Sequence, residues 1–600
     1  MHSHHFSIIF LIIFLTSLST TFSQPHHLLK PPSSAANTTA TESIALTPPL
    51  PTAALPLPPP ECTLSLLNNS FAYTYNQPPY TVLYSPPAVC PPPWSHVVLQ
   101  LSGEVSGDQY DRIAGVWLSG VEILRTSTPE PSENGTFWNV DKDVTRYSSV
   151  LEQSNVSLSM MLENLVNDEF TGIYNISLTM LFYKDDVVAE IKSRKLGFGS
   201  GVRVGLESGV LGSGVYDEPA DLVIPVGEEG DQGYWFRIEN ESEPGFKRVA
   251  IPMNSKRIVL ELYVSFHGDD EFWYSNPPTQ YIEMNKLDTR RGNGAYREVF
   301  VKIDGKLVAF EVPFPVIFTG GINPLSWDPI VAIGAFDLPS YDIELTPFLG
   351  SLLDGESHTF ELGVANSLSF WLVDANLHVW VDKNSTQVEG MVAVSEPSEY
   401  EESREYKFKQ LDGSFEIEAE RKSQSSGWVN CSTGNFTTSI TQKLKFKNSI
   451  EFQGAGSQKT VEQKVKVQTE VRVVAEDGTV VSVRTSKRQY PLQIVTSTIP
   501  GPEIDTEVMT TTISNELKVK STDGNVKTTL QNTQESEGSM MVKDHSVLSG
   551  RAVTRQTLSW KGSSCFSRNA EAADGILLRD DSIVACSSLN NDHNDLLSAW

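Results

Sequence analysis

The chain has 600 residues, of which 39% are apolar and 20% are charged. This composition supports a buried core and excludes a single disordered chain, and the length corresponds to roughly three or four domains. Lys and Arg number 46 against 74 Asp and Glu, a net charge of −28. The basic surface that binds nucleic acid or anionic lipid is therefore missing, and we expect no nucleic-acid partner.

Glycine and proline punctuate the sequence. The 40 glycines and 35 prolines lie mostly between short apolar runs. These runs alternate apolar and polar residues instead of repeating every three or four positions, which is typical of β-strands. The sequence therefore predicts an all-β protein, with tandem antiparallel β-sandwiches as the simplest architecture.

The chain begins with an apolar leader. Phe6–Leu18 is almost unbroken in its hydrophobicity and is followed by Ser and Thr, which suits a signal peptide and is short for a membrane span. We expect a signal peptide over residues 1–23, with an uncleaved anchor as the alternative. Residues 24–60 are rich in Pro, Ser and Thr, so we expect them to be disordered. No other segment reaches spanning length, and we expect no stable membrane association.

The first folded unit is expected over residues 61–190. His96–Leu101, Ile113–Leu118 and Ile176–Tyr183 are strand-length runs rich in β-branched and aromatic residues. Residues 191–220 follow as a Gly-rich connection that begins at the basic patch Lys192–Lys195. This patch and the segment near 390–405 are alternative protease sites, and cleavage would give two chains from one precursor.

Two further β units are expected. Residues 221–390 predict a second sandwich, because apolar residues of Ile258–Phe266 alternate onto one face and Asp304-Gly305 suits a two-residue hairpin turn. Residues 391–600 predict a C-terminal β domain in which alternate valines share one face, with hairpin turns at three Asp-Gly pairs: Asp412-Gly413, Asp477-Gly478 and Asp523-Gly524.

Sequons and cysteines agree with a secretory route. Five cysteines are too few for a disulfide scaffold, but Cys62 with Cys90 and Cys565 with Cys586 are plausible local pairs, leaving Cys431. Nine Asn-x-Ser/Thr sequons are candidate glycosylation sites: Asn37, Asn68, Asn134, Asn155, Asn175, Asn240, Asn384, Asn430 and Asn435.

No metal or cofactor motif is present. The sequence lacks His-Glu-x-x-His, Cys-x-x-Cys, a Gly-x-Ser-x-Gly elbow and a phosphate loop, so we expect no metal and no cofactor. Carboxylates beside aromatic residues suit carbohydrate binding, because sugar CH faces stack on rings while hydroxyl groups bind oxygens. Such residues are also typical of solvated strand edges. They cluster in four places: Asp108–Arg112, Glu271–Tyr274, Tyr296–Glu298 and Phe336–Glu344.

Long motifs at these places resemble a known family. Tyr110–Leu118, Val121–Pro131, Thr319–Pro324 and Gly334–Tyr341 are similar to the plant peptide N-glycosidase A family, and the likeness extends over roughly residues 60–600. Members of this family remove whole N-glycans from asparagine. The resemblance implies an amidase whose substrate is an N-glycopeptide or glycoprotein.

A fainter resemblance links the first two units to bacterial peptide N-glycosidase F, a pair of jelly rolls with the active site between them. Tyr110-Asp111-Arg112 stands where that enzyme has Trp-Asp-Arg, which implies that Asp111 is the leading catalytic residue. Glu163 and Glu298 are implied as supporting carboxylates. Substrate-binding roles are expected for five residues near these positions: Tyr110, Arg112, Trp273, Asp337 and Asp342.

The expected reaction is water attack on the glycosylated Asn amide, with Asp111 as base and Arg112 keeping it ionised. A carboxylate-pair endo-glycosidase and a non-catalytic carbohydrate-binding β-sandwich are the alternatives. The leader and the acidic surface indicate secretion to the apoplast or cell wall, or to the vacuole, and on the same ground we expect an acidic pH optimum.

Overall fold

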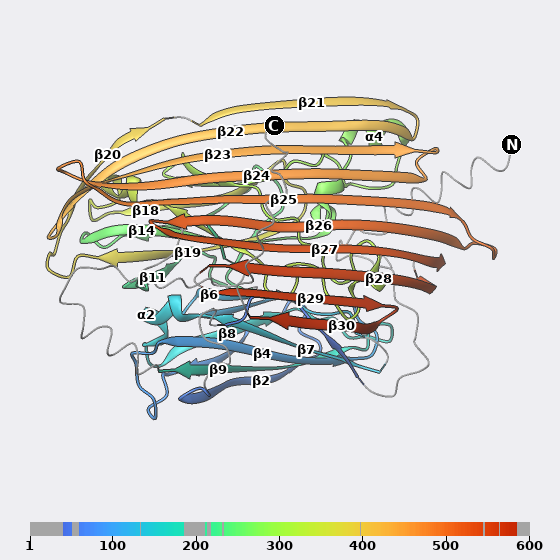
Figure 1. Cartoon of the computed structure of the whole chain (residues 1–600), viewed down its shortest axis with the longest axis horizontal. Helices are drawn as coiled ribbons and strands as arrows, with labels where there is room; N and C mark the ends of the chain where they lie inside the picture. Colours follow the sequence, from blue (N-terminus) through green and yellow to red (C-terminus); the bar gives the residue numbers. More distant parts are fainter. Residues whose placement is uncertain are drawn as a thin grey trace.

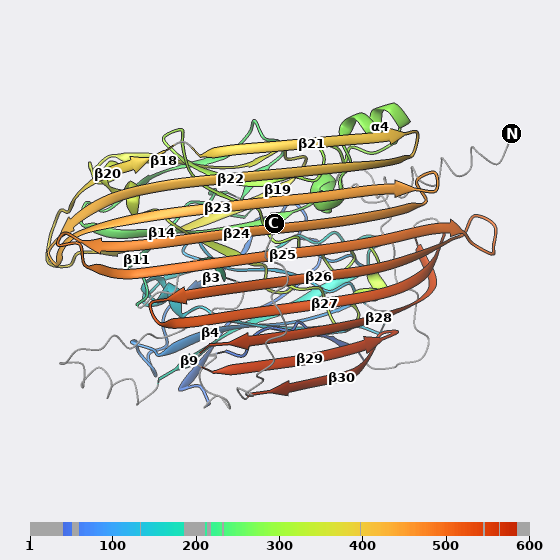
Figure 2. The ribbon, with the colours of Figure 1, turned by 45° about the horizontal axis from the view of Figure 1, so that its top comes forward.

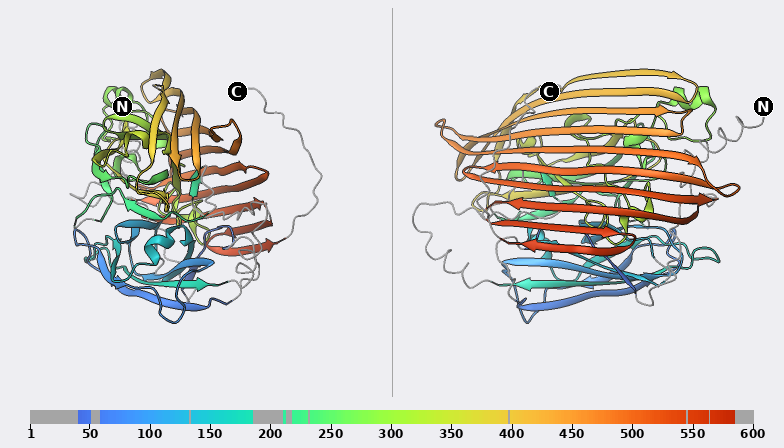
Figure 3. Two further views of the ribbon diagram at one scale, coloured as in Figure 1. Left: turned by 90° about the vertical axis from the view of Figure 1, so that its left-hand side faces the viewer. Right: turned by 45° about the vertical axis from the view of Figure 1, so that its right-hand side comes forward.

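The structure is a computed structural model that describes residues 40–50, 59–131, 134–184, 210–212, 218–230, 233–396, 398–543, 546–562 and 564–584. Within these ranges the chain forms three β units. The second sandwich lies against one face of a long C-terminal sheet, and the first sandwich lies beside the second. The sheet spans the width of the molecule in Figure 1 and forms a separate layer in the left panel of Figure 3. The signal peptide expected over residues 1–23 and the patch Lys192–Lys195 lie outside the described residues.

The first unit is an eight-stranded jelly roll with one added strand. Its sheets have the orders β1-β7-β4-β9-β2 and β3-β8-β5-β6, and apart from β1 the neighbouring strands are antiparallel. Both sheets contribute alternate apolar residues to one core. The elements are β1 (Thr41–Ser43), β2 (Cys62–Phe71), β3 (Tyr80–Tyr84), β4 (His96–Ser106), β5 (Ile113–Leu118), β6 (Val121–Ser127), β7 (Thr136–Asp143), η1 (Thr145–Tyr147), α2 (Ser148–Leu151), β8 (Val156–Leu162) and β9 (Ile173–Tyr183).

The second unit repeats this topology. Its sheets have the orders β10-β17-β14-β19-β11, with β12 also on β19, and β13-β18-β15-β16. The elements are β10 (Val210–Gly212), β11 (Leu222–Pro225), β12 (Phe236–Ile238), β13 (Gly245–Ala250), β14 (Ser255–Phe266), η2 (Gly268–Asp270), η3 (Trp273–Ser275), α4 (Thr279–Asn285), β15 (Glu298–Ile303), β16 (Lys306–Glu311), η4 (Pro324–Trp327), β17 (Ser340–Glu344), η5 (Thr346–Ser351), β18 (Ser357–Ala365) and β19 (Trp371–Val381). The prediction of two jelly-roll sandwiches is confirmed, and Asp304-Gly305 forms the expected turn between β15 and β16 with both φ angles positive.

The C-terminal unit is one 11-stranded antiparallel sheet, whose edges are β21 and β30 in Figure 2. One face alternates buried residues such as Leu444 and Phe446 onto the second sandwich, and the opposite face carries Lys443 and Lys445. The strands are β20 (Glu389–Ser395), β21 (Glu399–Lys409), β22 (Asp412–Cys431), β23 (Gly434–Gln453), β24 (Gln458–Ala475), β25 (Val480–Pro500), β26 (Glu507–Asp523), β27 (Val526–Lys543), β28 (Ser546–Lys561), β29 (Cys565–Ala573) and β30 (Ile576–Ile583).

Two predicted hairpin turns of this sheet are displaced. Asp523 pairs with Val526, so the turn expected at Asp523-Gly524 lies at Gly524-Asn525. The turn expected at Asp412-Gly413 lies at Gln410-Leu411, because Lys409 already pairs with Asp412. Leu411 is buried in the core and its carbonyl accepts the hydroxyl of Tyr281 at 2.8 Å. Burial of Leu411 therefore outweighed the turn preference of Asp412-Gly413 in setting the register.

Residues 40–50 are ordered, which corrects the expectation that all of residues 24–60 are disordered. Strand β1 pairs in parallel with β7 of the first sandwich, and Ile44 forms a bridge with Ile330 of the second. The carbonyl of Leu46 accepts the amide of Asn532 in the C-terminal sheet at 3.3 Å. We call residues 40–50 the N-terminal strap, since it contacts all three units.

Apolar residues of the strap explain why it packs against the folded units. The strap contains Ile44, Leu46 and Leu50, and Leu46 and Leu50 are buried. Leu46 packs in a small cluster with Ile330 and Trp560. Strand β10 likewise falls inside the expected connection 191–220 yet pairs with β17.

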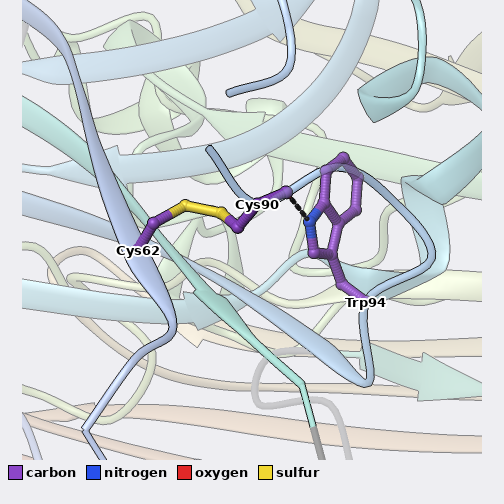
Figure 4. Close-up of a disulfide and its surroundings, with 3 residues drawn as sticks. All are labelled: Cys62, Cys90 and Trp94. Carbon is purple, nitrogen blue, oxygen red and sulfur yellow. Dashed lines mark hydrogen bonds between the residues drawn. A yellow bond between two sulfur atoms is a disulfide. The ribbon is translucent and has the colours of Figure 1, made fainter. Parts of the chain in front are cut away.

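Cys62 and Cys90 are joined by the expected disulfide, drawn in Figure 4 with Trp94, whose indole N–H donates to the carbonyl of Cys90 at 2.8 Å. Their Cα atoms are 6.2 Å apart, within the range of natural disulfides. Cys431 has a free thiol. Cys586 lies outside the described residues, so its pairing with Cys565 stays a prediction.

The sequons lie at accessible positions wherever the structure describes them. Five of the asparagines are exposed: Asn68, Asn134, Asn155, Asn384 and Asn430. Three are partly exposed, namely Asn175, Asn240 and Asn435, and Asn37 lies outside the described residues. Within the described ranges, no helix combines the length and hydrophobicity needed to cross a membrane.

The N-terminal strap predicts a stability effect. Leu46→Ala should lower the free energy of unfolding by about 2–5 kcal/mol, because it empties a buried site at which the strap joins the second sandwich and the C-terminal sheet. Urea unfolding followed by tryptophan fluorescence measures the change. Leu83→Ala on β3 is the matched control, since Leu83 is 77% exposed, and equal effects of the two substitutions would contradict the role of the strap.

Candidate active site

A pocket of about 160 Å³ lies between the two sandwiches. The first sandwich contributes Tyr110–Ile113, from the segment between β4 and β5, and Glu163, directly after β8. The second contributes residues from β12, from the segment after β14, from the segment after β16 and from the start of β19: Trp235, Arg237, His267, Gly268, Glu271, Phe318, Phe370 and Leu372. Loops at matching ends of the two jelly rolls therefore meet around one cavity.

Asp111 spans the junction of the two sandwiches. Its Oδ1 accepts the backbone N–H of Gly320, in the loop after β16, at 3.2 Å. Burial raises the pKa of Asp111 to about 6, although the positive charge of Arg112 and the N–H of Gly320 act in the opposite direction. The carboxyl is thus a stronger base than an ordinary aspartate and is still ionised near neutral pH.

Gly320 lies close to two carboxylates. A Cβ atom at this position would lie 2.3 Å from Oε1 of Glu130 and 2.8 Å from Oδ1 of Asp111. The adjacent Thr319 donates its hydroxyl to the carbonyl of Thr128 at 3.0 Å. The loop of the second sandwich therefore packs closely onto the first, and a larger residue at position 320 would displace one of these carboxylates.

Glu271 is the second carboxyl group of the pocket. It follows η2, where Gly268 has φ +58 and where a Cβ atom would lie 2.7 Å from the carbonyl oxygen of Ser369. Burial raises the pKa of Glu271 to about 8, the negative charge of Asp111 raises it further, and Arg291 opposes the shift. Glu271 is therefore protonated at neutral pH.

Asp111 and Glu271 thus differ in protonation within one cavity. At neutral pH Asp111 is ionised and can accept a proton, whereas Glu271 is neutral and can donate one. Two titratable groups whose surroundings separate their pKa values provide the base and the acid of a hydrolytic reaction. The arrangement suits hydrolysis of a bond whose leaving group must be protonated.

Aromatic rings form one wall of the pocket. The ring of His267 stacks between Phe318, at 5.6 Å between ring centroids, and Phe370, at 5.1 Å. The guanidinium carbon of Arg237 lies 3.5 Å from the centroid of Phe370. Burial lowers the pKa of His267 to about 3, with further lowering by Arg125 and Arg237, so the imidazole is neutral. Because these rings stack on one another and Arg237 covers Phe370, the wall is apolar and closely packed.

Four of the residues predicted for the site line the pocket: Tyr110, Asp111, Arg112 and Glu163. The guanidinium of Arg112 donates to Oε1 of Gln109 at 2.5 Å, which holds it against the first sandwich. Glu163 accepts the backbone N–H of Asn76 at 3.1 Å. The carbonyl of Tyr110 accepts the hydroxyl of Tyr174 at 2.6 Å.

Glu298, predicted as catalytic, is not part of the pocket. It lies at the start of β15, where its carboxylate pairs with Arg421 of the C-terminal sheet at 2.8 Å and accepts the hydroxyl of Tyr296 at 2.8 Å. This buried ion pair joins the second sandwich to the long sheet. Glu298 therefore belongs to the contact between the second sandwich and the C-terminal sheet.

Three predicted substrate-binding residues also lie elsewhere. Trp273 is fully buried in the core. Asp337 lies 3.3 Å from the ammonium of Lys142, and Asp342 accepts the guanidinium of Arg146 at 2.8 Å. Both aspartates belong to the buried interface between the sandwiches, because Lys142 and Arg146 come from the first unit. In the segment Phe336–Glu344, Asp337 and Asp342 are thus interface residues.

The structure adds residues that the sequence prediction missed. Glu271 and Glu130 both stood inside noted segments, the carboxylate-aromatic cluster 271–274 and the motif Val121–Pro131. Pairing of β5 with β6 in the first sandwich brings the segment of Glu130 beside that of Asp111. Glu271 reaches the same pocket only through the packing of the second sandwich, which local sequence does not specify. Among the described residues, no group of three His, Cys, Asp or Glu side chains could hold a metal ion.

Comparison with known proteins identifies related sequences. The family model for peptide N-acetyl-β-D-glucosaminyl asparaginase amidase A matches residues 48–398, and the model for its C-terminal domain matches residues 414–492. The peptide-N4-(N-acetyl-β-glucosaminyl)asparagine amidase A of Prunus dulcis is 41% identical over 524 residues, which cover 86% of this chain and 89% of that protein.

Solved structures give more distant matches. Peptide N-glycanase F of Flavobacterium meningosepticum aligns with 13% identity and a TM-score of 0.32 over 53% of this chain and 96% of its own. PNGF-II aligns with 14% identity and a TM-score of 0.35 over 53% and 66%. The extent of the sequence matches, in contrast, establishes the relationship, and the chain belongs to the peptide N-acetyl-β-D-glucosaminyl asparaginase amidase A family.

Proposed function

We propose that this protein is a glycoamidase that hydrolyses the amide bond between N-acetylglucosamine and the side chain of asparagine in N-glycopeptides. The reaction releases the intact glycan as a glycosylamine and leaves aspartate in the peptide. Membership of the amidase family supports this substrate class. The observation that carries the proposal is the pair Asp111 and Glu271, which differ in protonation within one pocket.

The pair accounts for each proton in the reaction. Asp111 takes a proton from water as the water oxygen attacks the amide carbonyl carbon, and Glu271 gives its proton to the amide nitrogen as the carbon–nitrogen bond breaks. The products are a carboxylic acid and a glycosylamine, which later loses ammonia in solution. The charge of Arg112 beside Asp111 favours the ionised base.

The remaining pocket residues suit the sugar. The apolar wall formed by Phe318, His267 and Phe370 lies against the innermost N-acetylglucosamine. Glu163, on the first sandwich, is placed to accept sugar hydroxyl groups from the other side of the cavity. With the sugar bound in this way, we place the amide bond between the carboxyl groups of Asp111 and Glu271.

Asp111→Asn should abolish turnover while leaving a folded protein. We expect kcat to fall by about 10²–10⁴-fold, because the base is lost, and glycopeptide binding to persist. Mass spectrometry of a treated glycopeptide provides the readout, since amidase action converts Asn to Asp. Asp328→Asn is the matched control, because burial also raises the pKa of Asp328 to about 6 but the residue lies outside the pocket.

The same readout separates the alternatives. An endo-glycosidase would leave one N-acetylglucosamine on the asparagine, and a carbohydrate-binding protein without activity would leave the glycopeptide unchanged. Either product pattern with wild-type protein would overturn the proposed reaction. Substantial activity of Asp111→Asn would remove Asp111 from the mechanism.

The two pKa values predict a bell-shaped pH profile. The rate should rise as Asp111 ionises near pH 6 and fall as Glu271 loses its proton near pH 8. The expected maximum thus lies between these values, above the acidic optimum that surface charge alone suggested. Glu271→Gln should lower kcat/KM by about 10²–10⁴-fold and remove the alkaline limb, as measured by kcat/KM from pH 4 to 10.

Glu507→Gln is the control for this profile. Burial raises the pKa of Glu507 to about 7, yet this residue begins β26 in the C-terminal sheet and does not line the pocket. Its replacement should leave both limbs unchanged. An alkaline limb that persists in Glu271→Gln would exclude Glu271 as the acid.

We further propose that the protein is secreted, to the apoplast, cell wall or vacuole. The apolar leader, the accessible sequons and the Cys62–Cys90 disulfide support a secretory route. Cleavage near Lys192–Lys195 or near 390–405 would give two chains from one precursor. N-terminal sequencing of the mature protein tests the leader and both cleavage sites.

A further inference from the structure

A second depression lies next to the active-site pocket on the second sandwich. This groove is lined by Gly227–Glu229, by Phe236 and Arg237 of β12, and by Glu243–Lys247. It shares Glu228 and Arg237 with the pocket that contains Asp111 and Glu271. These two residues therefore border both depressions.

An exposed aromatic ring lies in the groove. Phe246 on β13 is 68% exposed, an unusual position for a phenylalanine. The residue before it is Gly245, where a Cβ atom would lie 2.1 Å from Cγ of Phe236. The absence of a side chain at Gly245 lets β13 lie close to the ring of Phe236, and Phe246 is left facing solvent.

The groove also contains charged residues of both signs. Lys247 pairs with Glu229 at 2.8 Å, and Arg237 pairs with Glu239 at 2.5 Å while its guanidinium lies on Phe370 of the pocket wall. The groove therefore has three carboxylates, Glu228, Glu229 and Glu243, against two cations. This balance disfavours an anionic ligand and suits a neutral one that is rich in hydroxyl groups.

The proposed reaction determines which part of the bound substrate extends beyond the pocket. With the amide at Asp111 and Glu271 and the first sugar on the wall of Phe318, His267 and Phe370, the rest of the glycan must extend outwards past Arg237. We propose that the groove is a binding subsite for the outer, neutral sugars of the N-glycan and that Phe246 stacks on one of them. This inference rests on the proposed function and names a residue that determines specificity for glycan length.

Two substrates with the same peptide test the subsite, one carrying two N-acetylglucosamine residues and one carrying a high-mannose glycan. Phe246→Ala should raise KM about threefold to tenfold for the high-mannose substrate, corresponding to loss of a ring contact. KM for the short substrate and kcat for both should be unchanged, because Phe246 is remote from the reacting bond. Phe137→Ala is the matched control, since Phe137 is 39% exposed on β7 of the first sandwich.

Each outcome has a distinct meaning. Equal KM values for wild type and Phe246→Ala on the long substrate, or equal increases on both substrates, would overturn the subsite. Equal increases would assign the groove to the peptide, because both substrates carry the same peptide. Wild-type protein that converts neither substrate would refute the amidase function itself, which keeps the two failures separate.

A free high-mannose oligosaccharide provides a second measurement. It should inhibit wild-type enzyme, and Phe246→Ala should weaken this inhibition by the same threefold to tenfold. Inhibition of equal strength in both proteins would contradict stacking on Phe246 even if the kinetic constants changed.

Discussion

The contact between Asp111 and the backbone N–H of Gly320 joins the carboxyl that we propose as the base, on one sandwich, to a loop of the other. Asp111 has an elevated pKa because the second sandwich removes water from it, and Glu271 is protonated because it is buried near that same charge. Neither property belongs to a single sandwich. The chemistry of the site therefore depends on a fixed orientation of the two jelly rolls.

Buried charges hold this orientation. Arg125 on β6 makes a bidentate pair with Glu122 at 2.7 Å and donates to the carbonyl of Leu372 across the interface at 2.6 Å. Although burial raises the pKa of Glu261, the charge of Arg146 and a hydrogen bond from His378 keep it well below its usual range. Buried charges are costly unless each is satisfied. A shift of one sandwich on the other would separate these partners and leave buried charges unsatisfied, which disfavours sliding at the pocket.

Buried ion pairs connect the C-terminal sheet to the second sandwich. Glu298 pairs with Arg421, and Glu311 pairs with Arg488 at 2.7 Å, so two buried ion pairs connect the sandwich to different strands of the sheet. The N-terminal strap, at the other end of the sequence, also connects the units because it contacts all three of them. Within the described residues one continuous apolar core includes residues of all three units. The sheet therefore packs into the shared core, although none of its residues lines the pocket.

The sequence by itself determined the strands, because alternation and turn residues act over a few positions, and its Tyr-Asp-Arg motif located Asp111. Hairpins followed local preference at Asp304-Gly305 but not at Asp412-Gly413, where burial of Leu411 moved the turn. Only the tertiary structure decided which carboxylates serve the site: Glu271 entered the pocket, while Glu298, Asp337 and Asp342 became partners of buried cations. The reason is that the pKa and the contacts of a carboxyl depend on which surface is packed over it, and that surface comes from residues far away in the chain.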